Sequence, residues 1–142
     1  MINIFTKKLP SRIATDVQER YDSLLPIFKA YAESKSDKYY AGIANNYEMG
    51  CFILGLAIFY KSVVVPLREA GTGFRDFRKK DVESIQIGKY IFSYNESRQI
   101  QAMYEDFIEV ITRHQISEHL LLFSDIKGFA RTLNTYFINT HD

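Results

Sequence analysis

The sequence predicts a mainly α-helical single domain over residues 1–142, a helical bundle around a central apolar helix at about residues 48–65, with a small β-hairpin at residues 84–94. An uncharged apolar block in the middle of the chain indicates the central helix. Apolar residues spaced three and four apart on both sides of it are typical of amphipathic helices. A short stretch rich in β-branched and aromatic residues indicates the hairpin. The length of 142 residues suits one domain.

Residues 49–60 form the apolar block and carry no charge. A helix that is apolar on every side is buried either in a protein or in a membrane. Spanning a bilayer takes about 20 apolar residues, whereas a run of about 10–14 is typical of a core helix. Lys61 ends the uncharged run, so we expect a core helix and no membrane span. The valines at 63–65 leave a helix or an extended segment open, because they precede Pro66 and β-branched residues favour strands.

Two helices are expected around the start of the apolar block. The first begins at Ser11, a candidate N-cap, and continues with apolar residues at helical spacing. Pro26 falls inside this pattern and predicts a kink or a division into two helices, because proline lacks the N–H that a helix needs. The second helix begins near Lys38 and leads into the block, with a bend expected at residues 45–46 or at Gly50.

The second half of the chain is expected to contain the hairpin and two further helices. Residues 69–81 form the least regular stretch. Gly88 and Lys89 are expected to make the tight turn of the hairpin, since a Gly-X pair suits such turns. Asn95 is a candidate N-cap for the next helix, and Ser117 is a candidate N-cap for a single last helix.

The overall charge is nearly balanced, with 18 Lys and Arg residues against 17 Asp and Glu residues. A dedicated nucleic-acid binder usually has a strongly basic domain or face, so the balance argues against one while leaving room for a local basic patch. Cys51 is the only cysteine and lies in the apolar block, so we expect a buried, unreactive thiol. The N-terminus shows no secretory signal, and together these features predict a cytoplasmic protein.

No pattern in the sequence is typical of catalysis or of metal binding. His114 and His119 fall in neither the E-x-x-H nor the H-x-x-x-H spacing, which would place metal ligands on one helix face. We therefore expect no catalytic residue, no metal site and no cofactor, and a protein that is not an enzyme.

A cluster of basic residues follows the central block. This basic patch consists of Arg75, Arg78, Lys79 and Lys80. The preceding glycines, Gly71 and Gly73, match no established phosphate-loop spacing, so a mobile charged loop is the simpler interpretation. The alternative is a contact with RNA or DNA, in which the cations bind phosphates and Phe74 or Phe77 stacks on a base.

A cluster of acidic residues lies on the helix after the hairpin. This acidic patch consists of Glu105, Asp106 and Glu109. The three residues fall opposite the apolar stripe of their helix, so we expect them to face solvent. Such a surface suits a basic partner, for example the phosphate-binding face of a nuclease toxin.

By elimination, the sequence predicts a small cytosolic interaction protein that binds and neutralises or regulates a macromolecular partner, in the manner of immunity proteins and antitoxins. We expect a protein partner, such as a toxin, to bind through the basic or the acidic patch. Two alternatives stay open: a nucleic-acid-associated accessory or regulatory protein that uses the basic patch, and a helical small-molecule sensor or enzyme with an apolar pocket. The oligomeric state does not follow from the sequence.

Overall fold

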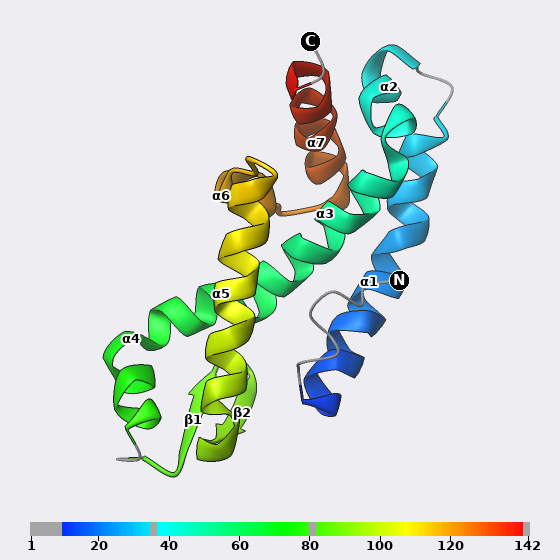
Figure 1. The fold of residues 1–142 in the computed structure, drawn as a ribbon. Coiled ribbons are helices and arrows are strands. Elements are labelled where there is room, and N and C mark those ends of the chain that lie inside the picture. The colour runs from blue at the N-terminus through cyan, green and yellow to red at the C-terminus, as the bar shows by residue number, and fades with distance from the viewer. Residues whose placement is uncertain (1–9, 35–36, 80–81, 141–142) are drawn as a thin grey trace.

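The computed structural model describes residues 10–34, 37–79 and 82–140. Its centre is a continuous helical path of three consecutive segments, which crosses the molecule diagonally in Figure 1. The segments are α3 (Tyr47–Phe59), the π-helix η1 (Tyr60–Val64) and α4 (Val65–Arg78). This path extends well beyond the expected helix at 48–65.

Most of the apolar block is buried, as the sequence predicts, although Met49 at its start is exposed. Every residue from 53 to 60 is buried, and the path lies in one hydrophobic core with residues of the surrounding helices. Among the described residues, Tyr47–Arg78 is the one helix long and apolar enough to cross a membrane. However, 72% of its most apolar window is buried inside the protein, as in the core helix of a soluble protein. The predicted mainly helical fold around a central helix is confirmed.

The valines of the central path are helical, so the alternative of an extended segment is wrong. Val63 and Val64 are buried in η1, and this burial outweighs the preference of β-branched residues for strands. Pro66 lies in the first turn of α4, where its missing N–H costs little and its fixed φ suits the helix.

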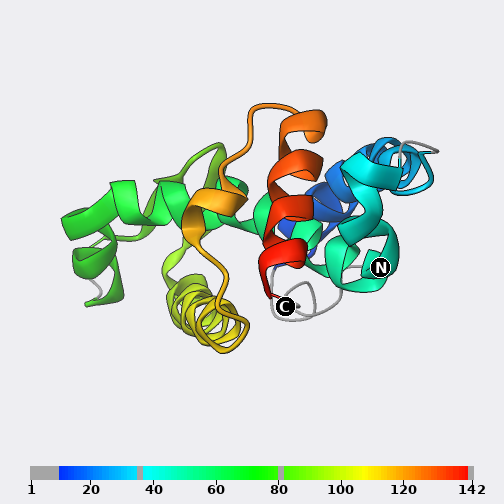
Figure 2. The ribbon, with the colours of Figure 1, turned by 90° about the horizontal axis from the view of Figure 1, so that it is seen from above.

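The stretch at 69–81, expected to be irregular, is also helical as far as Arg78. Its irregularity is confined to Gly71, where φ is 47° and ψ is −116°. A left-handed φ favours glycine, and the direction of α4 changes at this residue. In Figure 2, viewed from above, α4 lies at one end of the molecule and α2 at the other.

Helix α1 (Ser11–Ala32) packs against α3. Pro26 lies within α1 without dividing it, so of the two predicted outcomes, a kink or a division, the division is wrong. Because Pro26 has no N–H, the carbonyl of Asp22 lacks its usual helical hydrogen bond. Both residues are exposed, so water can donate to this carbonyl instead. The helix begins after Pro10, and the expected side-chain cap at Ser11 does not form.

Helix α2 (Asp37–Asn45) packs against the last helix, α7 (Ile126–Thr140). The two backbones approach closely at Gly42, where an added Cβ would lie 2.8 Å from Asn134 Oδ1. Asn134 is buried, and its Oδ1 accepts the Ile43 N–H at 3.2 Å. This bond satisfies a buried polar side chain between the two helices.

The expected bend before the apolar block is at Asn46, where φ is −128° and ψ is 38°. Gly50, the other expected bend, lies inside α3 without breaking it. An added Cβ there would lie 2.8 Å from Phe28 Cζ, so its lack of a side chain admits the ring of Phe28.

The expectation of a single last helix is wrong, because residues 122–125 separate two helices. Ser117 caps the short helix α6 (Glu118–Leu121), and its Oγ accepts the His119 N–H at 3.2 Å. A second cap begins α7, because Asp125 Oδ1 accepts the Gly128 N–H at 2.6 Å.

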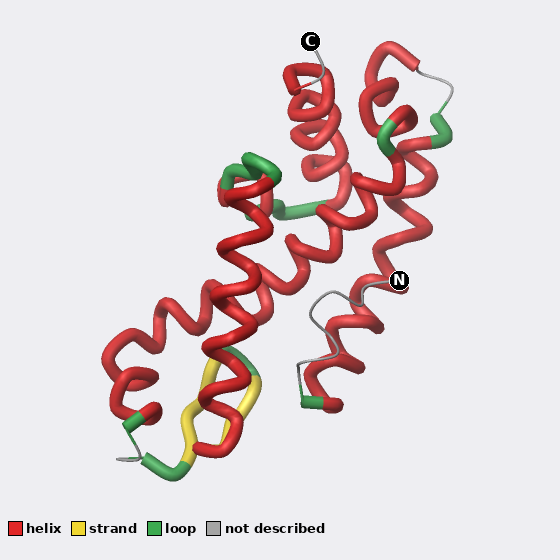
Figure 3. The backbone as a smooth tube through the Cα atoms, in the orientation of Figure 1, coloured by secondary structure: helices red, strands yellow, loops and turns green. Residues whose placement is uncertain are grey.

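The predicted hairpin is confirmed. Strands β1 (Ser84–Ile87) and β2 (Tyr90–Ser93) pair antiparallel, and Gly88 takes a φ of 61° in the turn. Figure 3 shows the two strands at the end of the molecule where α4 and the start of α5 lie. A two-stranded hairpin is marginally stable by itself, and β1 packs against α4.

Helix α5 (Ser97–Arg113) follows β2 through the short 3-10 helix η2 (Tyr94–Glu96). The cap at this point is Ser93 and not the expected Asn95. Ser93 and Glu96 form a capping box, in which the Ser93 N–H donates to Glu96 Oε1 at 2.9 Å.

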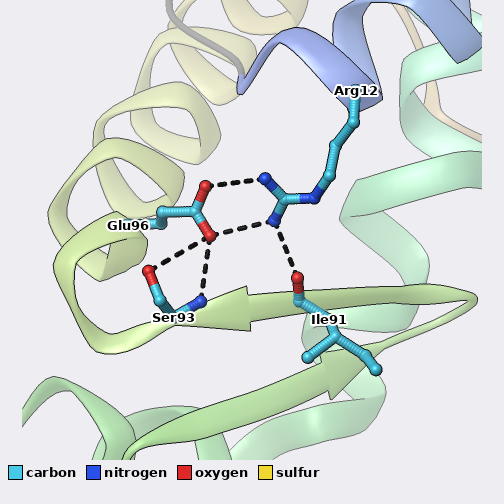
Figure 4. A network of polar contacts seen from close by, with 4 residues as sticks. All are labelled: Arg12, Ile91, Ser93 and Glu96. Atoms are coloured by element: carbon cyan, nitrogen blue, oxygen red, sulfur yellow. Dashed lines mark hydrogen bonds and ion pairs between the residues drawn. The ribbon is translucent and has the colours of Figure 1, made fainter.

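Glu96 also ties this corner to α1 through Arg12 (Figure 4). Arg12 donates to both carboxylate oxygens, at 2.9 and 3.0 Å, and to the Ile91 carbonyl at 2.7 Å. The hydrogen bond from Arg12 is the main reason that the pKa of Glu96 lies below its ordinary value. The network joins the first turn of α1 to the hairpin.

We expect the Glu96→Gln variant to be less stable than the wild type by about 0.2–1 kcal/mol at neutral pH, because the ion pair is lost while an amide can keep the capping box. The lowered pKa of Glu96 stabilises the fold above the ordinary glutamate pKa of about 4.3 and ceases to do so as the pH falls through the folded value. The stability difference between variant and wild type should therefore vanish in acid. Urea unfolding from neutral to acidic pH measures this, and Glu19→Gln, an exposed position on α1, is the control.

Candidate functional site

The described residues of the basic patch lie on the second half of α4 and at its C-cap. Arg75, Arg78 and Lys79 are exposed, whereas Lys80 lies outside the described residues. Arg75 and Arg78 line a groove between α4 and α5 with a volume of about 280 Å³. The other residues that line this arginine groove are Leu67, Arg68, Gly71, Phe74, Gln101 and Tyr104. The structure thus places two of the predicted basic residues beside a third arginine.

Arg68 is not among the residues of the predicted basic patch. It forms a bidentate ion pair with Glu118, the first residue of α6, and its Nε donates to the Tyr104 hydroxyl at 3.1 Å. Glu118 also accepts the Tyr60 hydroxyl at 2.7 Å. The hydrogen bond from Arg68 holds the pKa of Glu118 below its ordinary value, so this carboxylate is charged at neutral pH. Arg68 is therefore a fixed guanidinium at the wall of the groove.

A signal for Arg68 was present in the sequence. Arg68 precedes Arg75 by seven residues, or about two helical turns, so an unbroken helix would place the two on one face. The expectation of an irregular stretch at 69–81 concealed this spacing. In the structure the helix changes direction at Gly71, between the two residues, and Arg68 and Arg75 line the same groove across this change of direction.

The aromatic residues of the basic patch are not available for stacking on a nucleic-acid base. Phe77 is fully buried and Phe74 is 6% exposed. The Phe74 ring contacts the Arg78 guanidinium, whose Cζ lies 5.3 Å from the ring centroid. The burial of both side chains in the hydrophobic core weighs against the alternative in which Phe74 or Phe77 stacks on a base.

The acidic patch lies on α5 and begins beside the arginine groove. Glu105 and Glu109 are exposed, and Asp106 is half-buried. Gln101 lines the groove and its Nε2 donates to Glu105 Oε1 at 3.1 Å. Glu109 forms an ion pair with Arg113 at 4.0 Å. Surfaces of opposite charge are therefore neighbours on α4 and α5, a relation that the sequence did not predict.

The remaining candidate residues form no joint site. His119 is exposed, and His114 is half-buried with its ring 5.7 Å from that of Phe52. Within residues 10–34, 37–79 and 82–140, no group of three or more His, Cys, Asp or Glu side chains could hold a metal ion.

Cys51 is half-buried rather than fully buried, which differs from the expectation. It lies beside two tyrosines, Tyr21 and Tyr47. Burial, together with a hydrogen bond to Cys51, raises the pKa of Tyr47 to about 12. Both tyrosines are therefore neutral at physiological pH.

A second groove lies away from the charged patches, between α6 and α7. It has a volume of about 680 Å³, and its lining includes Gln115, Arg131, Thr132 and Asn139. Leu120 and Tyr136 also line it, so polar and apolar side chains are mixed there, and none of the residues that line it belongs to the central helix. This groove therefore does not lie beside the central apolar helix.

No protein-family model, no curated protein and no solved structure matches this chain. Any function must consequently be argued from the residues themselves.

Proposed function

We propose that this chain is a small interaction protein that binds and neutralises or regulates a macromolecular partner, as immunity proteins and antitoxins do. The observation that carries the proposal is the pairing of the arginine groove with the acidic patch on adjacent surfaces of α4 and α5. Surfaces of complementary charge determine which partner binds and how fast it associates.

The position of these charges supports a role outside folding. Arg75 has no ion pair or hydrogen bond within the part of the chain that the structure describes, and Arg78 contacts only the ring of Phe74. In contrast, Arg12 and Arg68 are each held by a carboxylate and connect helices. Charges that connect nothing within the fold are free to bind a partner.

A nucleic-acid-associated protein is the second candidate, because the arginine groove could bind phosphates. Two features weigh against it. The aromatic residues beside the arginines are buried, so base stacking has no platform. The acidic patch next to the groove would also repel a polyanion.

We expect charge reversal of the surface that binds the partner to weaken binding at least about tenfold, or about 1.4 kcal/mol, without changing the fold. The two test variants are Arg75→Glu/Arg78→Glu and Glu105→Lys/Glu109→Lys. The partner is first isolated by pull-down from native extract and identified by its mass, and its affinity is then measured by calorimetry.

The control for this experiment is Arg98→Glu, which reverses an exposed cation on α5 that does not line the groove. Circular dichroism should give the same melting temperature for all the variants and the wild type. If both double variants bind the isolated partner as the wild type does, the charged surface on α4 and α5 is not the interface and the proposal fails.

A further inference from the structure

We propose that the arginine groove receives one acidic side chain of a protein partner, while basic side chains next to it on the partner contact the acidic patch. This inference rests on the proposed function, and it specifies the charge pattern that the partner must present. An acidic residue flanked by basic residues is the pattern that fits.

The groove offers guanidinium groups that are suited to a carboxylate. A guanidinium presents its donors in a planar fork that matches the two oxygens of a carboxylate. Arg68 already uses its fork on Glu118, and this pair is neutral overall, so the positive charge of the groove comes from Arg75 and Arg78. Arg75 has no partner among the described residues, and Arg78 has no ion pair there, so both have donors available for an incoming carboxylate.

The size and walls of the groove suit one side chain. Its volume of about 280 Å³ is at the lower limit of ordinary ligand pockets. Leu67 and Phe74 supply apolar walls, against which the methylene groups of a glutamate can lie. Tyr104 and Gln101 add polar atoms on the α5 side. One acidic side chain would thus bury its stem and pair its charge in the same place.

The acidic residues around the groove argue for a protein and against a nucleic acid. Glu118 lies at Arg68, and Glu105 is held by Gln101 at the α5 side. Glu109 follows one helical turn later, about 5.4 Å further along α5. A nucleic-acid strand that ran along α5 would bring its next phosphates against Glu105 and Glu109. A protein can instead alternate the sign of its charges within this distance.

A random peptide library displayed on phage tests the inference even while the partner is unidentified. The library is selected on the immobilised wild-type chain, and peptides that also bind the Arg75→Gln/Arg78→Gln variant are removed. We expect the selected peptides to share an Asp or Glu with Lys or Arg one or two helical turns away. Selected peptides without an acidic residue, or no enrichment at all, would overturn the proposal.

A double-mutant cycle then tests the contact itself. The most enriched peptide and its counterpart with the acidic residue changed to the amide are measured against the wild type and Arg75→Gln/Arg78→Gln. Each change alone should weaken binding about tenfold. Both changes together should weaken binding little more than either change alone, since both remove the same ion pair. Arg98→Gln should bind as the wild type does. Additive losses would show that the acidic side chain does not enter the groove.

A fluorescein-labelled oligouridylate is the competing probe. We expect it to bind weakly and equally to the wild type and to Arg75→Gln/Arg78→Gln. Tight binding that falls steeply with salt and is lost in this variant would assign the groove to nucleic acid and overturn the proposal. The peptide experiments do not use the partner from native extract. If the peptide experiments fail, the result of the pull-down is unaffected. If the pull-down fails, the results of the peptide experiments are unaffected.

Discussion

Replacing Leu54 by Ala is expected to lower the free energy of unfolding by about 2–5 kcal/mol. Leu54 is fully buried near the middle of α3, where the helix is covered on all sides. Removing its isobutyl group loses the free energy of burial and leaves a cavity, because the surrounding helices cannot collapse onto it completely. Since small domains are stable by only about 5–15 kcal/mol, this is a large part of the total.

Urea unfolding followed by circular dichroism measures the change. Met49→Ala is the matched control, since Met49 lies on the same helix but is 37% exposed. It should cost much less than Leu54→Ala. Equal effects of the two substitutions, or an unchanged melting temperature for Leu54→Ala, would mean that α3 is not at the centre of the core.

Replacing Phe28 by Ala is expected to lower the free energy of unfolding by about 3–5 kcal/mol. The Phe28 side chain is fully buried and joins three helices. Its ring stacks on Tyr47 of α3 with centroids 5.9 Å apart and packs at the same distance against Phe129 of α7. It also lies against the backbone of α3 at Gly50. Its loss would therefore weaken the packing of α1, α3 and α7 together.

The neighbouring position supplies the control for this second substitution. Ile27 is on the same turn of α1 but is 44% exposed, so Ile27→Ala should change stability by far less. Thermal unfolding of both variants compares them directly. Equal melting temperatures for Phe28→Ala and Ile27→Ala would contradict the packing of α1 against α3 and α7 at this point.

The sequence alone determined the central helix and the hairpin. The block at 49–60 has no polar side, so a chain of this length can bury it only by surrounding it. Likewise, Gly88 supplies the left-handed φ that the turn requires. Both signals come from residues close together in the sequence, and the tertiary contacts agree with them. The charged character of the two patches was also readable, because charge is a property of the residues themselves.

Tertiary contacts decided the features that the sequence left open or predicted wrongly. Residues 63–65 are helical because burial in the core outweighs a modest strand preference. Phe74 and Phe77 looked available for binding, but the hydrophobic core covers both side chains. The spacing of apolar residues could not predict these features, since it does not determine which element packs against a given helix face.

The candidate site shows the same division. Its residue types were visible in the sequence, whereas the groove exists only because α5 lies beside α4 and brings Gln101 and Tyr104 to the arginines. Arg68 became part of the site through Glu118, fifty residues later in the chain. Sequence spacing determines which side chains share a helix face, and only the packing of helices against one another determines which faces meet.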